Sequence, residues 1–205
     1  MEKSSIVVIS GASGSGKGTV VKKLIKKDDR FHVSVSVTSR DPRDDDIPDV
    51  TYHFVTPEKF KDMIANDELA EHAIYADKYY GTPRYEIEDT LKAGKSVILE
   101  IDTHGALQIK KMYPDATLIW ITPPDYDNLE KRLRERDNNT ESDIIKRLTA
   151  SKNELQLLDY YDYIIINRDG EADKAAEQIR KILEVKALAV SSNKDFRAEF
   201  YKKNI

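Results

Sequence analysis

One short stretch near the amino end has the composition of a phosphate-binding loop. It reads Gly11-Ala12-Ser13-Gly14-Ser15-Gly16-Lys17-Gly18-Thr19. A Gly-x-x-x-x-Gly-Lys loop can point its backbone N–H groups at phosphate oxygens, while its lysine reaches the β- and γ-phosphates of a nucleoside triphosphate. A tight turn or a dinucleotide-binding loop would also use the glycines, but neither needs Lys17 directly after Gly16. The serine or threonine that usually follows this lysine and holds Mg²⁺ is Gly18 here, with Thr19 one place later.

A second group of residues could clamp a phosphate with side chains. Arg40 and Arg43 stand three residues apart around Pro42, and two planar guanidinium groups at this spacing suit bidentate contact with a phosphate. Residues 31–38 alternate apolar and polar positions, which predicts one half-exposed strand with Ser36 on the same polar face as Arg40. Because three aspartates follow at 44–46, a solvated charge cluster is the competing interpretation.

Two carboxylates follow an apolar run later in the chain. Glu100 and Asp102 come at the end of the segment 97–102. In parallel sheets, ligands bind at the carboxyl edge of the strands, where a phosphate-binding enzyme needs metal or substrate ligands. Solvation of a strand end is the weaker alternative.

Three arginines, Arg132, Arg136 and Arg147, flank the polar linker 137–139. Apolar spacing predicts a helix on each side of this linker, and Thr140 with Asp143 predicts a capping box at the start of the second helix. Such a helical hairpin could act as a lid that carries guanidinium groups over phosphates and excludes water. Alternatively, the arginines pair with Glu130, Glu135 and Glu141, and this segment alone favours neither interpretation.

The surrounding elements predict the fold class that positions these residues. A wholly apolar strand followed by a helix recurs four times, beginning at residues 6, 97, 117 and 163. This pattern is typical of an α/β protein whose parallel sheet is covered by helices on both faces. We also expect Thr82 to cap a helix from 83 to 94, a helix over 105–112, and a final short helix whose Phe196 and Phe200 dock on the core or on another subunit.

Composition restricts the classes of partner. The 205 residues carry 33 basic and 37 acidic side chains, a net charge of −4, so no basic field favours nucleic acid or an anionic membrane surface. The chain has no cysteine, which excludes disulfides and thiol catalysis and fits a reducing cytoplasm. No apolar run reaches membrane length, and no signal peptide is recognised. A cytoplasmic location is therefore expected, as a monomer or homodimer.

Taken together, the motifs and their order resemble the guanylate kinase family over about residues 6–183. The resemblance depends on the phosphate loop, the Ser-x-x-x-Arg-x-x-Arg clamp, Tyr52, Glu71, Tyr80-Gly81-Thr82, the acidic strand end and the arginine lid. Its Gly-Lys-Gly-Thr ending is also similar to nucleoside monophosphate kinases generally. It implies a three-layer P-loop fold with a core (residues 1–32, 96–124 and 155–190), a GMP-binding lobe (33–95), a helical lid (125–154) and a C-terminal extension (191–205).

The resemblance also implies roles for individual residues. ATP would bind residues 11–19, and the catalytic residues would be Lys17, Arg40, Arg132, Arg136 and Arg147. The GMP site would comprise Ser36, Arg40, Arg43, Tyr52, Glu71, Tyr80, Thr82, Glu100 and Asp102. Within it, Arg40, Arg43, Tyr52 and Tyr80 would hold the phosphate, whereas Ser36, Glu71 and Thr82 would contact guanine. Mg²⁺ would be held mainly by the ATP phosphates, near Thr19, Glu100 and Asp102.

Some residues depart from the family pattern. The turn 44–51 has no glycine, Asp137 replaces a common lid glycine, Thr103 and His104 follow the acidic strand, and Arg168 follows Asn167. The implied reaction is ATP + GMP ⇌ ADP + GDP. Two alternatives are a kinase for another phosphorylated acceptor such as a ribose bisphosphate, and a non-catalytic protein-binding module of the same family. The first leaves Glu71 and Ser36 without a base to contact, and the second has no need of Lys17 and the arginines.

Overall fold

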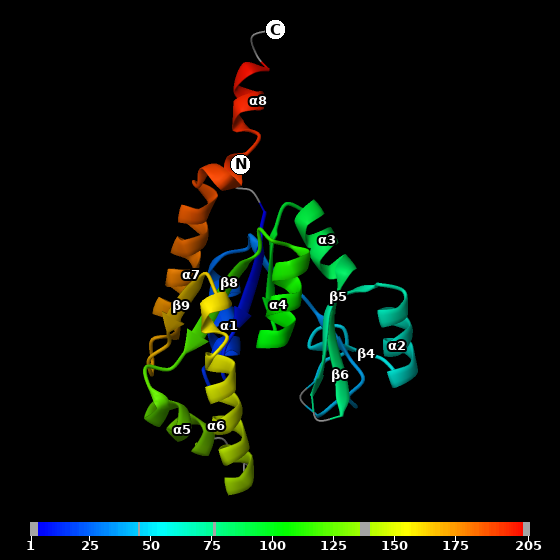
Figure 1. Ribbon diagram of the computed structural model, residues 1–205, viewed down its shortest axis with the longest axis vertical. Coiled ribbons are helices and arrows are strands. Elements are labelled where there is room, and N and C mark those ends of the chain that lie inside the picture. Colours follow the sequence, from blue (N-terminus) through cyan, green and yellow to red (C-terminus); the bar gives the residue numbers. More distant parts are fainter. Residues whose placement is uncertain (1–3, 45, 76, 136–139, 203–205) are drawn as a thin grey trace.

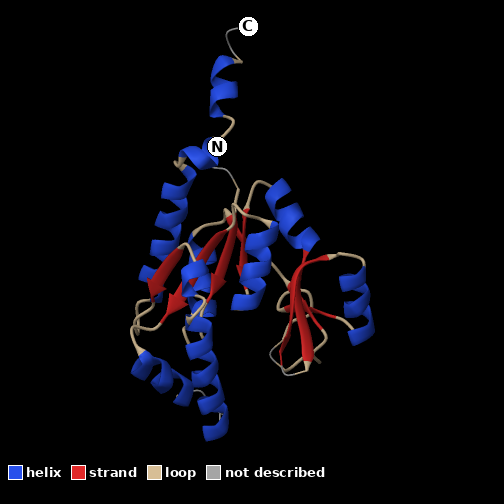
Figure 2. Ribbon diagram, in the orientation of Figure 1, coloured by secondary structure: helices blue, strands red, loops and turns tan. Residues whose placement is uncertain are grey.

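Two β-sheets organise the structure, a computed structural model that describes residues 4–44, 46–75, 77–135 and 140–202 (Figures 1 and 2). The five-stranded sheet has the order β2-β7-β1-β8-β9, and all its neighbouring strands are parallel. The four-stranded sheet has the order β4-β3-β6-β5 and is mixed. The predicted α/β class with a parallel core sheet is confirmed.

The elements have the following bounds. The core sheet consists of β1 (Ile6–Ser10), β2 (Phe31–Val33), β7 (Ser96–Glu100), β8 (Thr117–Thr122) and β9 (Tyr163–Ile166). The second sheet consists of β3 (Ser36–Thr38), β4 (Tyr52–Phe54), β5 (Leu69–Tyr75) and β6 (Lys78–Pro83). The helices are α1 (Lys17–Lys27), α2 (Pro57–Ala65), α3 (Arg84–Lys92), α4 (Thr103–Met112), α5 (Tyr126–Arg134), α6 (Glu141–Leu155), α7 (Ala172–Ala187) and α8 (Phe196–Tyr201), with 3₁₀ turns at Leu158–Tyr160 and Val190–Asn193.

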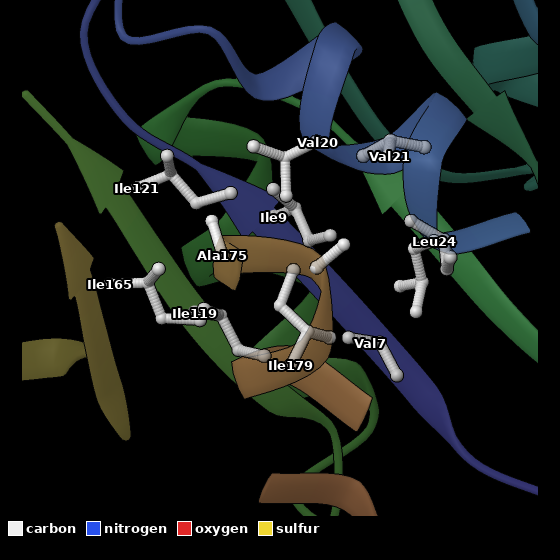
Figure 3. Packing of buried hydrophobic residues seen from close by; sticks show 12 residues of the cluster. Val7, Ile9, Val20, Val21, Leu24, Ile119, Ile121, Ile165, Ala175 and Ile179 are labelled. Atoms are coloured by element: carbon white, nitrogen blue, oxygen red, sulfur yellow. The ribbon is translucent and has the colours of Figure 1, made fainter. Parts of the chain in front are cut away.

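Helices cover both faces of the core sheet. On one face, Val20 and Leu24 of α1 and Ile179 of α7 pack on Val7 and Ile119 of the strands (Figure 3). On the other face, α3 and α4 pack against the alternate residues of β1, β7 and β8. Each such aliphatic side chain contributes about 1.5–3 kcal/mol when fully buried. This packing fixes the carboxyl ends of β1 and β7, where the phosphate loop and Glu100 lie.

Residues 31–38 form two strands in different sheets, so the prediction of one continuous strand is wrong. β2 pairs with β7 up to Val33, and β3 then pairs with β4 and β6 of the second sheet. Between them, the Ser34 N–H donates to the Ile98 carbonyl and the Val35 N–H to the Glu86 carboxylate. Alternation with a period of two fixes which side chains share a face, but not which sheet each half of the segment joins.

Two helix starts differ from prediction because the expected capping residues make other contacts. Thr82 does not cap α3, since Pro83 is its N-cap residue and the Thr82 hydroxyl donates to Glu71 instead. α4 starts at Thr103, two residues early, because Asp102 accepts a hydrogen bond from the Gly105 N–H at 2.8 Å. The capping box of α6 is confirmed.

The carboxy-terminal helix α8 does not dock on the core. Phe196 and Phe200 are 63% and 62% exposed, and the helix projects away from both sheets (Figure 1). Their rings contact each other, with centroids 5.8 Å apart. The expectation of docking on the core is therefore wrong. None of the helices in the described ranges has the length and apolar character that crossing a membrane requires.

Candidate active site

The phosphate loop links β1 to α1 and depends on glycine backbone conformations. Gly11 has φ +143°, and a Cβ there would lie 2.0 Å from the Ile121 carbonyl oxygen. Gly16 is left-handed and is the N-cap residue of α1 without a side-chain cap. The first N–H groups of α1 and its positive dipole end therefore suit an anion. Lys17 Nζ donates to the Gly11 and Ala12 carbonyls at 2.5 and 3.2 Å, folded back over the loop.

Two of the predicted lid arginines contact this loop. Arg147 of α6 donates to the Ser13 hydroxyl at 2.8 Å. Arg132 of α5 donates to the Asn167 carbonyl at 2.8 Å, to Asp169 Oδ1 and, at 3.4 Å, to the Ser15 carbonyl. Figure 1 shows the α5–α6 pair at the end of the core sheet that carries the loop. Arg136 lies outside the described residues.

The competing prediction is that lid arginines pair with lid glutamates. The structure shows such pairing for Arg134, which is not one of the three predicted lid arginines. Arg134 makes bidentate contacts with Glu141 at 2.6 and 2.9 Å and with Glu130 at 2.8 and 2.7 Å. Within the described residues, Arg132 pairs with Asp169 and contacts the loop, and Arg147 contacts Ser13 of the loop. Their role as lid arginines stays a prediction.

Asn167 is a loop contact that the sequence reasoning missed. Its Nδ2 donates to the Ser15 carbonyl at 2.9 Å, and the residue is 5% exposed. A Cβ on Gly16 would lie 2.5 Å from this nitrogen, so Gly16 also provides room for the asparagine. The available signal was a polar residue directly after the last apolar strand, at the same sheet edge as the loop.

In the second sheet, Arg40 lies among aromatic side chains. Its guanidinium carbon is 5.3 Å from the ring centroid of Tyr52 and 5.6 Å from that of Phe54. Tyr80 lies beside Tyr52, with ring centroids 6.0 Å apart. The pKa of Tyr52 is raised, mainly by burial, and the charge of Glu100 on the core sheet also raises it. The structure thus brings Arg40, Tyr52 and Tyr80 together, within reach of the charge of Glu100.

Asp46 pairs with Arg40, so the predicted solvated charge cluster is only partly correct. Arg40 Nη1 and Nη2 donate to the Asp46 carboxylate at 2.8 and 3.2 Å, and the Asp46 side chain is 6% exposed. Arg43 is exposed, but its N–H donates to the same carboxylate at 2.7 Å. The hydrogen bond to Arg40 and that from the Arg43 N–H lower the pKa of Asp46.

Glu71 is a buried carboxylate in the second sheet. The residue is 5% exposed, and Thr82 donates to its carboxylate at 2.7 Å across β5 and β6. Burial raises its pKa to about 7, the Thr82 hydrogen bond opposes the shift, and the charge of Asp102 adds to it. Ser36 is half-buried in β3, where it pairs with Tyr52 of β4.

Gly105 is a second residue that the sequence reasoning missed. A Cβ at this position would lie 2.5 Å from Glu71 Oε2, so a glycine in the first turn of α4 lets the carboxylate approach the helix. The Gly105 N–H also donates to Asp102. A glycine three residues after Asp102 of the acidic strand end was the signal available in the sequence.

Glu100 and Asp102 face different groups. Glu100 lines an open pocket with Lys17, Gly18 and Thr19, and its carboxylate oxygens are 3.5 and 3.6 Å from where a Cβ on Gly18 would lie. Burial raises the pKa of Glu100, while Lys17 and Lys22 oppose the shift. Asp102 instead caps α4 and acts on Glu71 through its charge. Glu100 therefore lies on the phosphate-loop side, and Asp102 on the Glu71 side.

Comparison with known proteins decides the family. The sequence model of guanylate kinase matches residues 3–186. The chain belongs to the guanylate kinase family. A guanylate kinase of Caldanaerobacter subterraneus subsp. tengcongensis is 38% identical over 98% of this chain and 96% of its own length. That of Clostridioides difficile is 37% identical over 100% and 99%. The crystal structure of the guanylate kinase from Anaplasma phagocytophilum superposes with a TM-score of 0.74 at 31% identity, covering 92% of this chain and 88% of that one.

Membership of the guanylate kinase family confirms the resemblance drawn from the motifs and their order. It also agrees with the two groups of side chains described above, one around Lys17 and one around Arg40 and Glu71. The roles of the individual residues stay predictions.

Proposed function

We propose that the protein transfers the γ-phosphoryl group of ATP to GMP, giving ADP and GDP. A phosphate oxygen of GMP forms a bond to the γ-phosphorus of ATP, and the bond from that phosphorus to the β–γ bridging oxygen breaks. The observation that carries this proposal is the hydrogen bond between the buried Glu71 and Thr82, in a sheet whose Tyr52 senses the charge of Glu100 beside the phosphate loop. A loop for a triphosphate and a pocket for a base are both required for this reaction.

The pocket around Glu71 suits guanine. Its carboxylate can accept hydrogen bonds from guanine N1–H and from the 2-amino group. Adenine offers a ring acceptor and no 2-amino donor, which would leave a buried carboxylate unpaired at a large cost in binding free energy. Thr82 and Ser36 supply hydroxyl groups that can donate or accept near the same base.

The transfer step depends on position and charge. The ionised GMP phosphate is already nucleophilic, so no general base is required. Lys17 would leave the loop carbonyls to contact the β- and γ-phosphates, while Arg132, Arg136 and Arg147 would neutralise charge on the moving group. Arg40, Arg43, Tyr52 and Tyr80 would orient the acceptor phosphate. Closure of the α5–α6 pair would exclude water and suppress ATP hydrolysis.

Mg²⁺ fits the donors beside the phosphate loop. Glu100 offers carboxylate oxygens next to Gly18, and Thr19 presents an exposed hydroxyl in the first turn of α1. Hard oxygen donors of this kind suit Mg²⁺, which commonly keeps only a few protein ligands and binds mainly through substrate phosphates. When bound, it would neutralise charge on the β- and γ-phosphates. Glu100 and Thr19 are the residues that would hold it, with Asp102 farther toward Glu71.

An acceptor screen tests the proposal. ADP release would be measured with ATP, Mg²⁺ and GMP, AMP, CMP, UMP or a ribose bisphosphate as acceptor. We expect a strong preference for GMP. Equal rates with AMP would contradict the role of Glu71, and a preference for the ribose bisphosphate would favour the other kinase. Binding of labelled ATP without transfer to any acceptor would favour a protein-binding module. We also propose a cytoplasmic location, which the absence of cysteine fits.

A further inference from the structure

We propose that Asp46 is a positioning residue for the acceptor phosphate, because it holds the Arg40 guanidinium so that one edge stays available for an anion. This inference rests on the proposed function, in which Arg40 contacts the GMP phosphate. Asp46 lies in the glycine-free turn 44–51, the part of the clamp that departs from the family pattern.

The geometry of the pair supports positioning. A guanidinium can bind a carboxylate end-on through Nη1 and Nη2, or side-on through Nε and Nη2. Asp46 binds Arg40 end-on, at 2.8 Å to Nη1 and 3.2 Å to Nη2, and the Asp41 carbonyl accepts a second hydrogen bond from Nη1 at 2.8 Å. Within the described part of the chain, no acceptor contacts Nε. The side-on edge of Arg40 is therefore left for a second bidentate contact.

Aromatic rings restrict the guanidinium further. Tyr52 and Phe54 lie 5.3 and 5.6 Å from its central carbon, within the range of cation–π attraction. Rings beside the group and a carboxylate at its end together limit rotation of a long and otherwise flexible side chain. Arg40 would thus lose little conformational entropy when it binds a phosphate.

Asp46 also links the two arginines of the clamp. Its carboxylate accepts a hydrogen bond from the Arg43 N–H at 2.7 Å, while its own N–H donates to the Arg43 carbonyl at 3.0 Å. These two contacts join the Arg43 backbone to Asp46. They fix the backbone that carries Arg43 relative to the Arg40 guanidinium, although the Arg43 side chain is itself exposed.

The competing interpretation is that Asp46 blocks the clamp. A carboxylate beside Arg40 repels a phosphate and could occupy its place, so removal of Asp46 would then strengthen GMP binding. The two interpretations predict changes of opposite sign. Positioning is favoured because the Asp46 side chain is 6% exposed and uses only the far end of the guanidinium.

The test compares Asp46→Asn and Asp46→Ala with Asp44→Asn and Asp44→Ala. Asp44 is an exposed aspartate in the same turn, so its variants remove the same charge two residues away. We expect the KM for GMP to rise about tenfold or more in Asp46→Ala, because a charged hydrogen-bond partner is lost. The KM for ATP and the kcat at saturating GMP should change little, and Asp46→Glu should recover part of the GMP affinity. The Asp44 variants should match the unmodified protein.

The unmodified protein is assayed first, so that failure of the proposed function, seen as no transfer to GMP, is separate from failure of this inference. Melting temperatures are measured for all variants, and Asp46→Asn, which keeps the size and one acceptor oxygen, replaces Asp46→Ala if the alanine variant does not fold. A lower KM for GMP in Asp46→Asn would show that Asp46 blocks the clamp. Equal effects of the Asp44 and Asp46 variants would show that only net charge matters. Either result overturns the proposal.

Discussion

The phosphate loop and the arginine clamp are built from different kinds of contact, although both suit a phosphate. The loop consists of consecutive residues, with positive φ at Gly11, Gly14 and Gly16, and it follows β1, whose residues are all buried. The clamp gathers residues from 40 to 80 on and beside strands of three to six residues, held by a side-chain ion pair and edge-to-face rings. Backbone contacts within a packed core open less readily than side-chain contacts on a small sheet. Substitutions should therefore abolish turnover at the loop and change affinity or base choice in the second sheet.

The largest effect is expected for Lys17→Ala. Loss of the charge that meets the ATP phosphates should reduce kcat about a thousandfold or more with every acceptor, since electrostatic stabilisation of the transferring group is removed. Lys23→Ala is the matched control, because Lys23 lies on the same helix but pairs with Asp173 at 2.9 Å. Steady-state ADP release would measure both variants. Residual activity near that of the unmodified protein would contradict the role of the loop.

A smaller and base-specific effect is expected for Glu71→Gln. The amide cannot accept from both guanine donors, so kcat/KM for GMP should fall about a hundredfold, while the lower rate with AMP should hold or rise. Glu68→Gln, which alters an exposed glutamate just before β5, serves as control. If GMP and AMP rates fell equally, Glu71 would support the fold and not base choice.

Gly105→Ala tests the close approach of α4 to Glu71. The new Cβ would lie 2.5 Å from Glu71 Oε2 and should push the carboxylate aside, raising the KM for GMP by about tenfold, a cost comparable to one misplaced charged hydrogen bond. The KM for ATP should not change. Alanine also stabilises a helix by about 1 kcal/mol relative to glycine. A lower melting temperature of Gly105→Ala would therefore show that the clash outweighs this gain.

The smallest effect is a pH dependence that is stronger for GMP than for ATP. Burial raises the pKa of Glu71 to about 7, and the proposed base contact needs the ionised form. The KM for GMP should therefore rise about fivefold from pH 7 to pH 6, in inverse proportion to the ionised fraction of Glu71. The KM for ATP should rise less over this range. In Glu71→Gln the rise in the KM for GMP that is due to protonation of Glu71 should disappear. An unchanged pH dependence in this variant would show that another group is responsible.

Ionisation of Glu71 should favour GMP binding but lower the free energy of unfolding. Because the folded state binds the Glu71 proton more tightly than the unfolded state, its contribution is present at low pH and is lost as pH rises. A pKa raised from the ordinary 4.5 to about 7 corresponds to a loss of about 3 kcal/mol in the free energy of unfolding. Denaturant titrations of the unmodified protein and Glu71→Gln at pH 5 and pH 8 would measure it.

The sequence predicted features that depend on local patterns. The four apolar strands, the loop conformation and the α6 capping box each follow from neighbouring residues. Predictions failed where contacts with distant residues decide the structure. Thr82 donates to Glu71 and does not cap α3, and the segment 31–38 divides between two sheets. Gly105 and Asn167 were missed because their importance lies in distances to Glu71 and Gly16 that no spacing along the chain reveals.

The contacts of Lys17 have a consequence for the heat of nucleotide binding. Its ammonium group already donates to the Gly11 and Ala12 carbonyls, so ATP would be received by an exchange of acceptors. The Ala12 carbonyl keeps the Ser15 N–H as a donor after such an exchange. Because the hydrogen bonds that Lys17 breaks and forms largely cancel, its contribution to the enthalpy of ATP binding should be small. Its contribution to affinity would then come mainly from the attraction between its charge and the phosphates.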